Sequence, residues 1–190
     1  MATLLHSPLL EKRRVTVAEY EAMPEDGHQY QLIHGQLIMS PSPSWDHQGM
    51  ADEITGQFRD FLRGKSIGKY RSASIDVFLG DHVLQPDVLF VSPEHAARIS
   101  PQGVRGAPDL VVEVLSPGTT RRDRKVKREI YQEFGVREMW FVSPKTRQIE
   151  VHRQAGGVYA APFTISSGET LTSPLLPGFT LDVAAVFDAD

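Results

Sequence analysis

The sequence predicts an α/β fold in which a mixed β-sheet is flanked by helices. Two observations lead to this prediction. Short runs rich in Val and Leu, at residues 86–91 and 109–115, are typical of strands that are buried on both faces. Apolar residues recur at helical spacing over residues 46–63 and 121–134. Because helices and buried strands follow one another along the chain, their apolar faces can cover both sides of one sheet.

Length and composition are those of a globular protein. The chain has 190 residues, of which 41% are hydrophobic and 23% charged. We expect a lead-in over residues 1–15 and one domain over residues 16–190. The net charge is −4, so a nucleic-acid partner would need a local basic patch. Cysteine is absent, which excludes disulfides, thiolate metal sites and cysteine nucleophiles.

No apolar run approaches the ~18 residues of a membrane-spanning helix. The first ten residues also lack the charged and apolar regions of a signal peptide. We therefore expect a cytoplasmic protein without a membrane partner.

The first half of the chain contains clear element signals. Thr16 and Glu19 form a capping-box pattern for a short helix that ends near Pro24. The remaining expected elements are a hairpin (30–33 and 36–39), a helix (46–63), one strand over 69–79, a turn at 81–82 and the strand 86–91.

The second half contains the longest apolar strands. After a short helix or irregular crossover at 93–101, we expect the strand 109–115 and then a helix capped by Thr119 or Thr120 and ended by Gly135. A strand over 136–142, a meander of strands over 148–152 and 158–164, and a short apolar segment near 183–187 complete the order.

Two acids within these apolar strands are the candidate site. Glu113 lies inside one buried-type strand, and Asp87 opens another. A buried carboxylate is costly unless a metal, a cation or several donors meet it. Two carboxylates suit Mg²⁺ or Mn²⁺, which also take waters and substrate oxygens. Alternatively, Asp87 is a turn residue after Pro86, and Glu113 forms a buried ion pair with an arginine.

The helix expected over 121–134 carries a lysine on its apolar face. At 100° per residue, Lys127 falls in the arc of Val126, Ile130, Tyr131 and Phe134. Glu113, on the preceding strand, is the expected partner, and such a lysine could polarise a phosphate. Alternatively, its stem packs while its ammonium reaches solvent.

The start of the same helix is strongly basic. Residues 121–128 hold six cations and one acid. Phosphate contacts at a helix start are the functional interpretation, and a solvated charged face is the alternative. The candidate phosphate contacts are Arg121, Arg122, Arg124, Lys125 and Arg128.

These motifs resemble a known family. The matching segments are Pro86-Asp87, residues 108–117, Arg122-Asp123 through Tyr131, and residues 136–144. They are similar to the restriction endonuclease family that is common in cyanobacteria and other bacteria, long described as a domain of unknown function, within the PD-(D/E)XK nuclease superfamily. The similarity also takes in residues 30–35, His47 and residues 171–181.

The resemblance implies a restriction-endonuclease-like core and Mg²⁺-dependent hydrolysis of phosphodiester bonds in nucleic acid. We expect DNA rather than RNA as the substrate, and the sequence alone leaves both open. It implies that Asp87 and Glu113 bind the metal and are catalytic together with Lys127. Most of the superfamily places the lysine two residues after the second acid, where this chain has Leu115. Lys127 resembles a catalytic lysine that has moved to the next helix and places its ammonium group in the same part of the site.

One departure concerns the early hairpin, where the family often has Tyr-Glu-Leu-Ile-Asp-Gly. This chain has Gln31 and His34 at the two acidic positions. If the glutamate belongs to the metal site, Gln31 lowers its charge, and metal affinity and activity should drop. Gln31, His47 and Asp109 are the candidate accessory residues. Trp45 and Trp140 are interpreted as core residues rather than as base-stacking platforms.

Three functional hypotheses follow. The leading one is a metal-dependent endonuclease. The second is a module that keeps the nuclease fold without its chemistry and binds nucleic acid or a protein partner, which Gln31 and the negative net charge favour. The third is a partner-binding protein whose apolar segment 136–187 forms a dimer surface. A homodimer is expected, since cleavage of a duplex needs two cuts.

Overall fold

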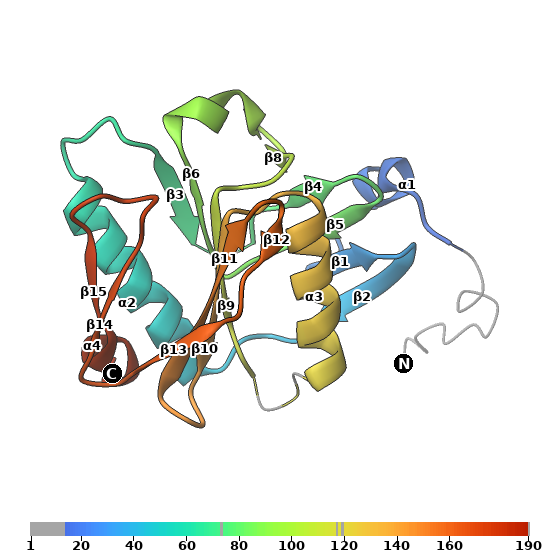
Figure 1. Cartoon of the computed structure of the whole chain (residues 1–190). Coiled ribbons are helices and arrows are strands. Elements are labelled where there is room, and N and C mark those ends of the chain that lie inside the picture. Colours follow the sequence, from blue (N-terminus) through green and yellow to red (C-terminus); the bar gives the residue numbers. More distant parts are fainter. Residues whose placement is uncertain (1–13, 73, 117, 119, 190) are drawn as a thin grey trace.

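The computed structural model describes residues 14–72, 74–116, 118 and 120–189 (Figure 1). The greater part of the expected lead-in, residues 1–13, therefore lies outside the described residues. Within these described residues, the main sheet has seven strands. In spatial order they are β12 (Val158–Tyr159), β11 (Gln148–Ala155), β10 (Glu138–Ser143), β9 (Leu110–Val114), β6 (Val88–Val91) and β3 (Lys69–Ser72), with β13 (Phe163–Ser166) paired to β11.

A second sheet of six strands lies beside the main sheet. Its order is β2 (Gln36–Ser40), β1 (Gln29–Ile33), β5 (His82–Leu84), β4 (Val77–Leu79), β8 (Gly103–Arg105) and β7 (Ile99–Ser100). A separate hairpin consists of β14 (Thr170–Thr172) and β15 (Thr180–Asp182). The helices are α1 (Val17–Glu21), α2 (Trp45–Leu62), the 3₁₀ helix η2 (Pro93–Arg98), α3 (Arg121–Glu133) and α4 (Val183–Phe187).

The predicted mixed sheet is confirmed, and helices cover both of its faces. Strands β9 and β10 are parallel, whereas β6 and β9 are antiparallel. Figure 1 shows α2 and α3 on opposite sides of the main sheet, each beginning at its lower edge. Residues on alternate positions of β9 therefore enter two cores. Val112 packs with the α2 side, and Val111 packs with α3 and the second sheet.

Helix caps follow the sequence signals. Thr16 and Glu19 form the predicted capping box of α1. The Thr120 hydroxyl caps α3 by accepting a hydrogen bond from Asp123 N, and the Asp123 carboxylate accepts one from the Thr120 backbone N–H. The alternative cap, Thr119, lies outside the described residues. Gly135 follows α3 with φ of 86°, a left-handed conformation that ends the helix.

Two of the predicted strands are wrong in extent. The strand predicted over 69–79 is divided between β3 of the main sheet and β4 of the second sheet. Asp76 anchors the crossing, because its carboxylate accepts hydrogen bonds from Tyr20 and Gln85 and its carbonyl accepts one from Val104. The strand predicted over 158–164 is likewise divided into β12 and β13.

The turn predicted at Asp81-His82 is displaced by one residue. Gly80, with φ of 61°, and Asp81 form the turn, while His82 begins the buried strand β5. The sequence did not reveal β5 because it has only three residues.

The prediction that Trp45 belongs to the core is wrong, whereas Trp140 is fully buried as expected. Trp45 is the first residue of α2 and 79% exposed, because the buried face of this helix begins only at Met50. The apolar residues of segment 136–187, which suggested a dimer surface, are mainly in the protein's own cores. Among the described residues, no helix is both long and apolar enough to cross a membrane.

Candidate active site

The main sheet brings Asp87 and Glu113 close together. Val88 pairs with Val112 at the end of the antiparallel ladder of β6 and β9, and Asp87 immediately precedes Val88. The two carboxyl groups are close enough for the Asp87 charge to contribute to the raised pKa of Glu113. The Asp87 N–H also donates to the Val112 carbonyl at 3.0 Å. Two acids separated by 26 residues of sequence therefore share one location.

Both carboxylate oxygens of Glu113 have partners from α3. Lys127 Nζ lies 2.6 Å from Glu113 Oε2, and the Tyr131 hydroxyl donates to Glu113 Oε1 at 2.7 Å. Glu113 is only 6% exposed. Burial raises the pKa of its carboxyl, and the Asp87 charge adds to this rise, whereas Lys127 opposes it. The Glu113 carboxylate is therefore costly to bury and depends on its two partners.

The predicted inward position of Lys127 is confirmed by this ion pair. The role of Tyr131 was missed, although the residue was expected on the buried face. A signal was available, because Tyr131 lies four residues after Lys127 and the two side chains are neighbours on the helix surface. Burial raises the pKa of the Tyr131 hydroxyl well above its ordinary value, so the hydroxyl keeps its proton and donates a hydrogen bond to Glu113.

Asp87 is held by a backbone donor and a histidine. Its Oδ2 accepts a hydrogen bond from Val114 N at 2.6 Å and lies 3.4 Å from His47 Nε2. His47 Nε2 also donates to the Val114 carbonyl at 3.1 Å. The hydrogen bond with Asp87 raises the pKa of His47, against the effect of burial. His47 reaches Asp87 from the first turn of α2, whose cap is Ser44.

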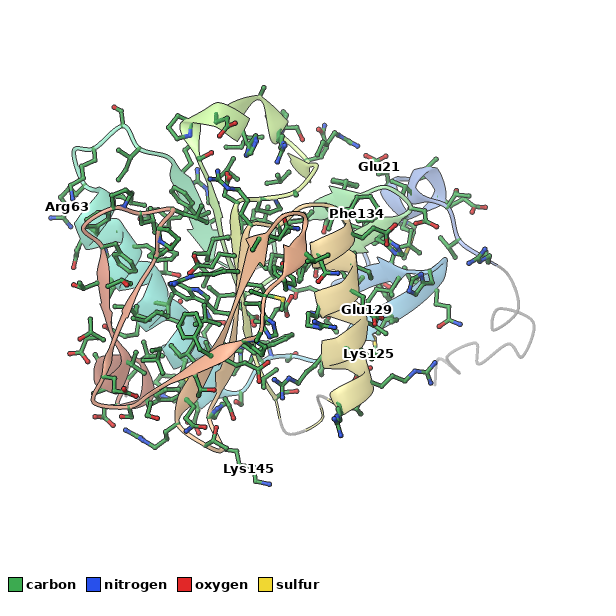
Figure 2. The ribbon with its side chains drawn as sticks, in the orientation of Figure 1. Glu21, Arg63, Lys125, Glu129, Phe134 and Lys145 are labelled. Carbon is green, nitrogen blue, oxygen red and sulfur yellow. The ribbon has the colours of Figure 1, made fainter. Side chains whose placement is uncertain are left out.

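The basic run at the start of α3 is only partly available for phosphate. Arg124 forms an ion pair with Glu150 at 3.0 Å, and Lys125 lies 3.7 Å from Glu129. Arg121 and Arg122 are exposed, and neither they nor Arg128 form an ion pair with another described residue. Figure 2 shows Lys125 and Glu129 along the outer side of α3.

The Gln31 side chain forms hydrogen bonds with residues in or next to the second sheet. Its amide donates to Ser40 Oγ at 3.1 Å, and its carbonyl oxygen accepts from Gln85 N at 3.4 Å. Gln85 is two residues before Asp87, so Gln31 reaches the neighbourhood of the site through the Gln85 backbone. His34 is a turn residue with φ of 52°, and its N–H donates to His82 Nδ1 at 3.1 Å.

Asp109 lies at the opposite end of β9 from Val114 and has partners of its own. Its carboxylate accepts from Ser92 N at 2.7 Å and lies 2.9 Å from His95 Nδ1 and 3.1 Å from Arg137 Nη1. Burial alone would raise the pKa of Asp109, but the donors from Ser92 and His95 outweigh it and the net pKa is lowered. The geometry therefore separates Asp109 from Asp87 and Glu113.

We predict that Asp109→Asn lowers the free energy of unfolding by about 3 kcal/mol at pH 7, because it removes a buried charge from its partners. Because the pKa of Asp109 is lowered in the folded state, its carboxylate stabilises the fold fully at pH values above its ordinary pKa. This stabilisation is lost as the pH falls through the folded-state pKa. Urea denaturation from pH 7 to pH 3 should show the two proteins converging only in acid. A constant difference at all pH values would contradict this assignment.

The two neighbouring carboxylates fit a hard divalent cation. Asp87 and Glu113 supply the oxygen ligands that Mg²⁺ and Mn²⁺ prefer, and Mg²⁺ commonly takes only one or two protein carboxylates. Among the residues that the structure describes, no group of three or more His, Cys, Asp and Glu side chains could hold a metal ion. A bound cation would therefore depend on waters and substrate oxygens for the rest of its coordination.

Comparison with known proteins identifies the family. The model of the Uma2 family, described as "Putative restriction endonuclease", matches residues 17–184. The chain belongs to the Uma2 family. The Uma2 match includes Asp87, Glu113 and Lys127, and it confirms the resemblance seen in the sequence. No curated protein matches this chain.

A solved structure shares the fold of this Uma2 protein. It is described as the crystal structure of a "putative nuclease belonging to DUF820" from Anabaena variabilis ATCC 29413. The TM-score is 0.78 at 18% sequence identity, with 92% of this chain and 98% of that chain covered. The predicted fold, a mixed sheet flanked by helices as in a nuclease, is thereby confirmed.

Proposed function

We propose that this Uma2 protein is a metal-dependent endonuclease that hydrolyses phosphodiester bonds, with DNA as the substrate and Asp87, Glu113 and Lys127 as its catalytic residues. The observation that carries the proposal is the proximity of Asp87, which immediately precedes β6, and Glu113 of the neighbouring strand β9, with Lys127 on the second carboxylate. Family membership supports nuclease chemistry, and the divalent metal, the DNA substrate and the residue roles are the finer part of the proposal.

Each residue has a definite task in the proposed reaction. Asp87 and Glu113 would hold Mg²⁺ or Mn²⁺, which when bound screens the charge of a phosphodiester and lowers the pKa of a water. Water adds to phosphorus, one ester P–O bond breaks, and the departing oxygen takes a proton. Lys127 Nζ places a positive charge beside Glu113, where it can stabilise the charge that develops on the phosphate. His47 holds Asp87 in position.

Cleavage assays test the proposal directly. Supercoiled plasmid and single-stranded DNA would be incubated with the protein in Mg²⁺, in Mn²⁺ and in EDTA. We expect cleavage in either metal and none in EDTA. Equal cleavage in EDTA would contradict the metal-dependent reaction. A protein that cleaves neither substrate and binds neither metal would not be an endonuclease of this kind.

A second candidate function is a binding module on the nuclease fold. Both oxygens of Glu113 are already occupied by Lys127 and Tyr131, and Gln31 supplies a neutral amide where the family often has an acid. Such a module would bind nucleic acid without Mg²⁺, and its affinity would fall steeply as salt rises. Measurement of DNA affinity in EDTA at several salt concentrations distinguishes it from the endonuclease.

We predict that Gln31→Glu raises the affinity for Mn²⁺ roughly tenfold, because it adds a negative charge near Asp87. The fold should be retained, since a carboxylate can still accept hydrogen bonds from Gln85 N and the Ser40 hydroxyl. The matched control is Gln36→Glu, which adds the same charge at an exposed position of the neighbouring strand. Equal affinities of the two variants in a Mn²⁺ titration would show that Gln31 has no special relation to the site.

A further inference from the structure

Among the residues that the structure describes, Trp45 is the most exposed of the large apolar side chains, with 79% of its surface accessible. Ile38 and Met39 of β2, at the other end of the loop of residues 41–44, are 44% and 57% exposed. Single exposed apolar residues are common, but a tryptophan at this level of exposure gives up much of the stabilisation that its burial would provide. An exposed aromatic ring of this size is therefore a candidate contact for a ligand.

The position of Trp45 relates it to the candidate active site. Trp45 is two residues before His47, whose Nε2 lies 3.4 Å from Asp87 Oδ2. At 100° per residue the two side chains leave opposite sides of α2, which is about 10 Å across. Trp45 thus lies at the tip of α2, about one helix diameter from the carboxylates. A nucleotide that contacts Trp45 would therefore be adjacent in the strand to the nucleotide bound at Asp87 and Glu113.

The surroundings of Trp45 are favourable for a polyanion. In Figure 1, α2 and α3 begin at the same lower edge of the main sheet, on either side of it. Arg121 and Arg122 at the start of α3 are exposed, and so is Lys145 in the turn between β10 and β11. Figure 2 shows Lys145 projecting from this lower edge. The acids in the first turns of these two helices are Asp46, next to Trp45, and Asp123, whose carboxylate is engaged in the capping box of α3.

We propose that Trp45 is a stacking platform for an unpaired base of the nucleic acid, one or two nucleotides from the bond at Asp87 and Glu113. This inference rests on the proposed function and adds to it the substrate class, a strand that is single or locally unpaired. Base–aromatic stacking accepts any base, because every base has a π-face, and neighbouring cations hold the backbone. Trp45 with Arg121, Arg122 and Lys145 supplies both parts.

Tryptophan fluorescence isolates this contact. The chain has two tryptophans, and Trp140 is fully buried with its indole N–H donated to Glu138 at 2.7 Å. Quenching by acrylamide therefore reports on Trp45. The experiment uses the full chain in EDTA, so that nothing is cleaved, with a fluorescein-labelled single-stranded oligonucleotide and the same sequence as a blunt duplex. Anisotropy of the label measures binding independently of Trp45.

We expect the single strand to quench Trp45 and to protect it from acrylamide, whereas the blunt duplex does so much less. Trp45→Ala should weaken single-strand binding about 5- to 150-fold, Trp45→Phe should lose less, and a Val158→Ala control at another exposed apolar residue should change nothing. Unchanged affinity of Trp45→Ala, with anisotropy still showing binding, would overturn the stacking role and leave the nuclease proposal intact.

Two other outcomes would also overturn the inference. Equal protection of Trp45 by the blunt duplex would contradict an unpaired base as its ligand. Protection that grows with protein concentration and needs no oligonucleotide would show that a second copy of the chain covers Trp45. If anisotropy shows no binding of either oligonucleotide, with or without Mn²⁺, the stacking role and the proposed function fail together.

Discussion

Lys127→Met is expected to lower the free energy of unfolding by about 3 kcal/mol at pH 7, because it leaves the buried Glu113 carboxylate without its cation. Burial already raises the pKa of Glu113, and loss of Lys127 should raise it further. A carboxyl group whose pKa is raised in the folded state destabilises that state when the pH is above the folded-state pKa. The destabilisation decreases as the pH falls through this pKa and the group becomes protonated. Urea denaturation between pH 8 and pH 5 should therefore show the deficit shrinking in acid.

Two controls separate the ion pair from other effects of the substitution. Lys125→Met removes an exposed cation from the same helix and should change stability by less than about 0.5 kcal/mol. Glu113→Gln combined with Lys127→Met removes both charges and should recover most of the lost stability without restoring cleavage. A deficit that persists at pH 5 and in the double variant would mean that Lys127 stabilises the fold by packing alone.

Asp87→Asn is expected to abolish metal-dependent cleavage, with a decrease of more than about 100-fold, because a metal ligand should matter more than the residues around it. The substitution is nearly isosteric, and the new amide oxygen can still accept the hydrogen bond from Val114 N. The fold should therefore be retained. Plasmid cleavage in Mn²⁺ measures the effect, and circular dichroism checks the fold.

The matched control is Asp60→Asn, which removes an exposed carboxylate that binds Arg63 at the far end of α2. It should cleave at the wild-type rate. Undiminished cleavage by Asp87→Asn would remove Asp87 from the active site and with it the proposed metal position.

The local sequence predicted most elements, because their signals lie within a few residues. The capping box of Thr16, the cap at Thr120 and the glycine after α3 each determine a helix end through contacts within about four residues. The division of residues 69–79 between two sheets was not predictable in this way. It depends on Asp76 meeting Tyr20 and Gln85, which come from other parts of the chain.

The candidate site was predictable to a similar extent. An acid inside a Val-rich strand and a lysine on an apolar helix face are both costly, so each suggested a partner, and the structure pairs them. Partners that depend on tertiary structure could not be derived. His47 can contact Asp87 only because the start of α2 lies beside the end of β9. Asp109 has partners away from the candidate site because η2 supplies His95.

Calorimetric titration with Mn²⁺ tests the metal site at Asp87 and Glu113 most directly. The proteins compared are the wild type, Asp87→Asn, Glu113→Gln and the control Asp60→Asn. We predict one binding event in the wild type and in Asp60→Asn, and its loss in the other two variants. Equal affinity in all four proteins, or no binding in the wild type, would contradict the proposal that these two carboxylates form the metal site of a nuclease.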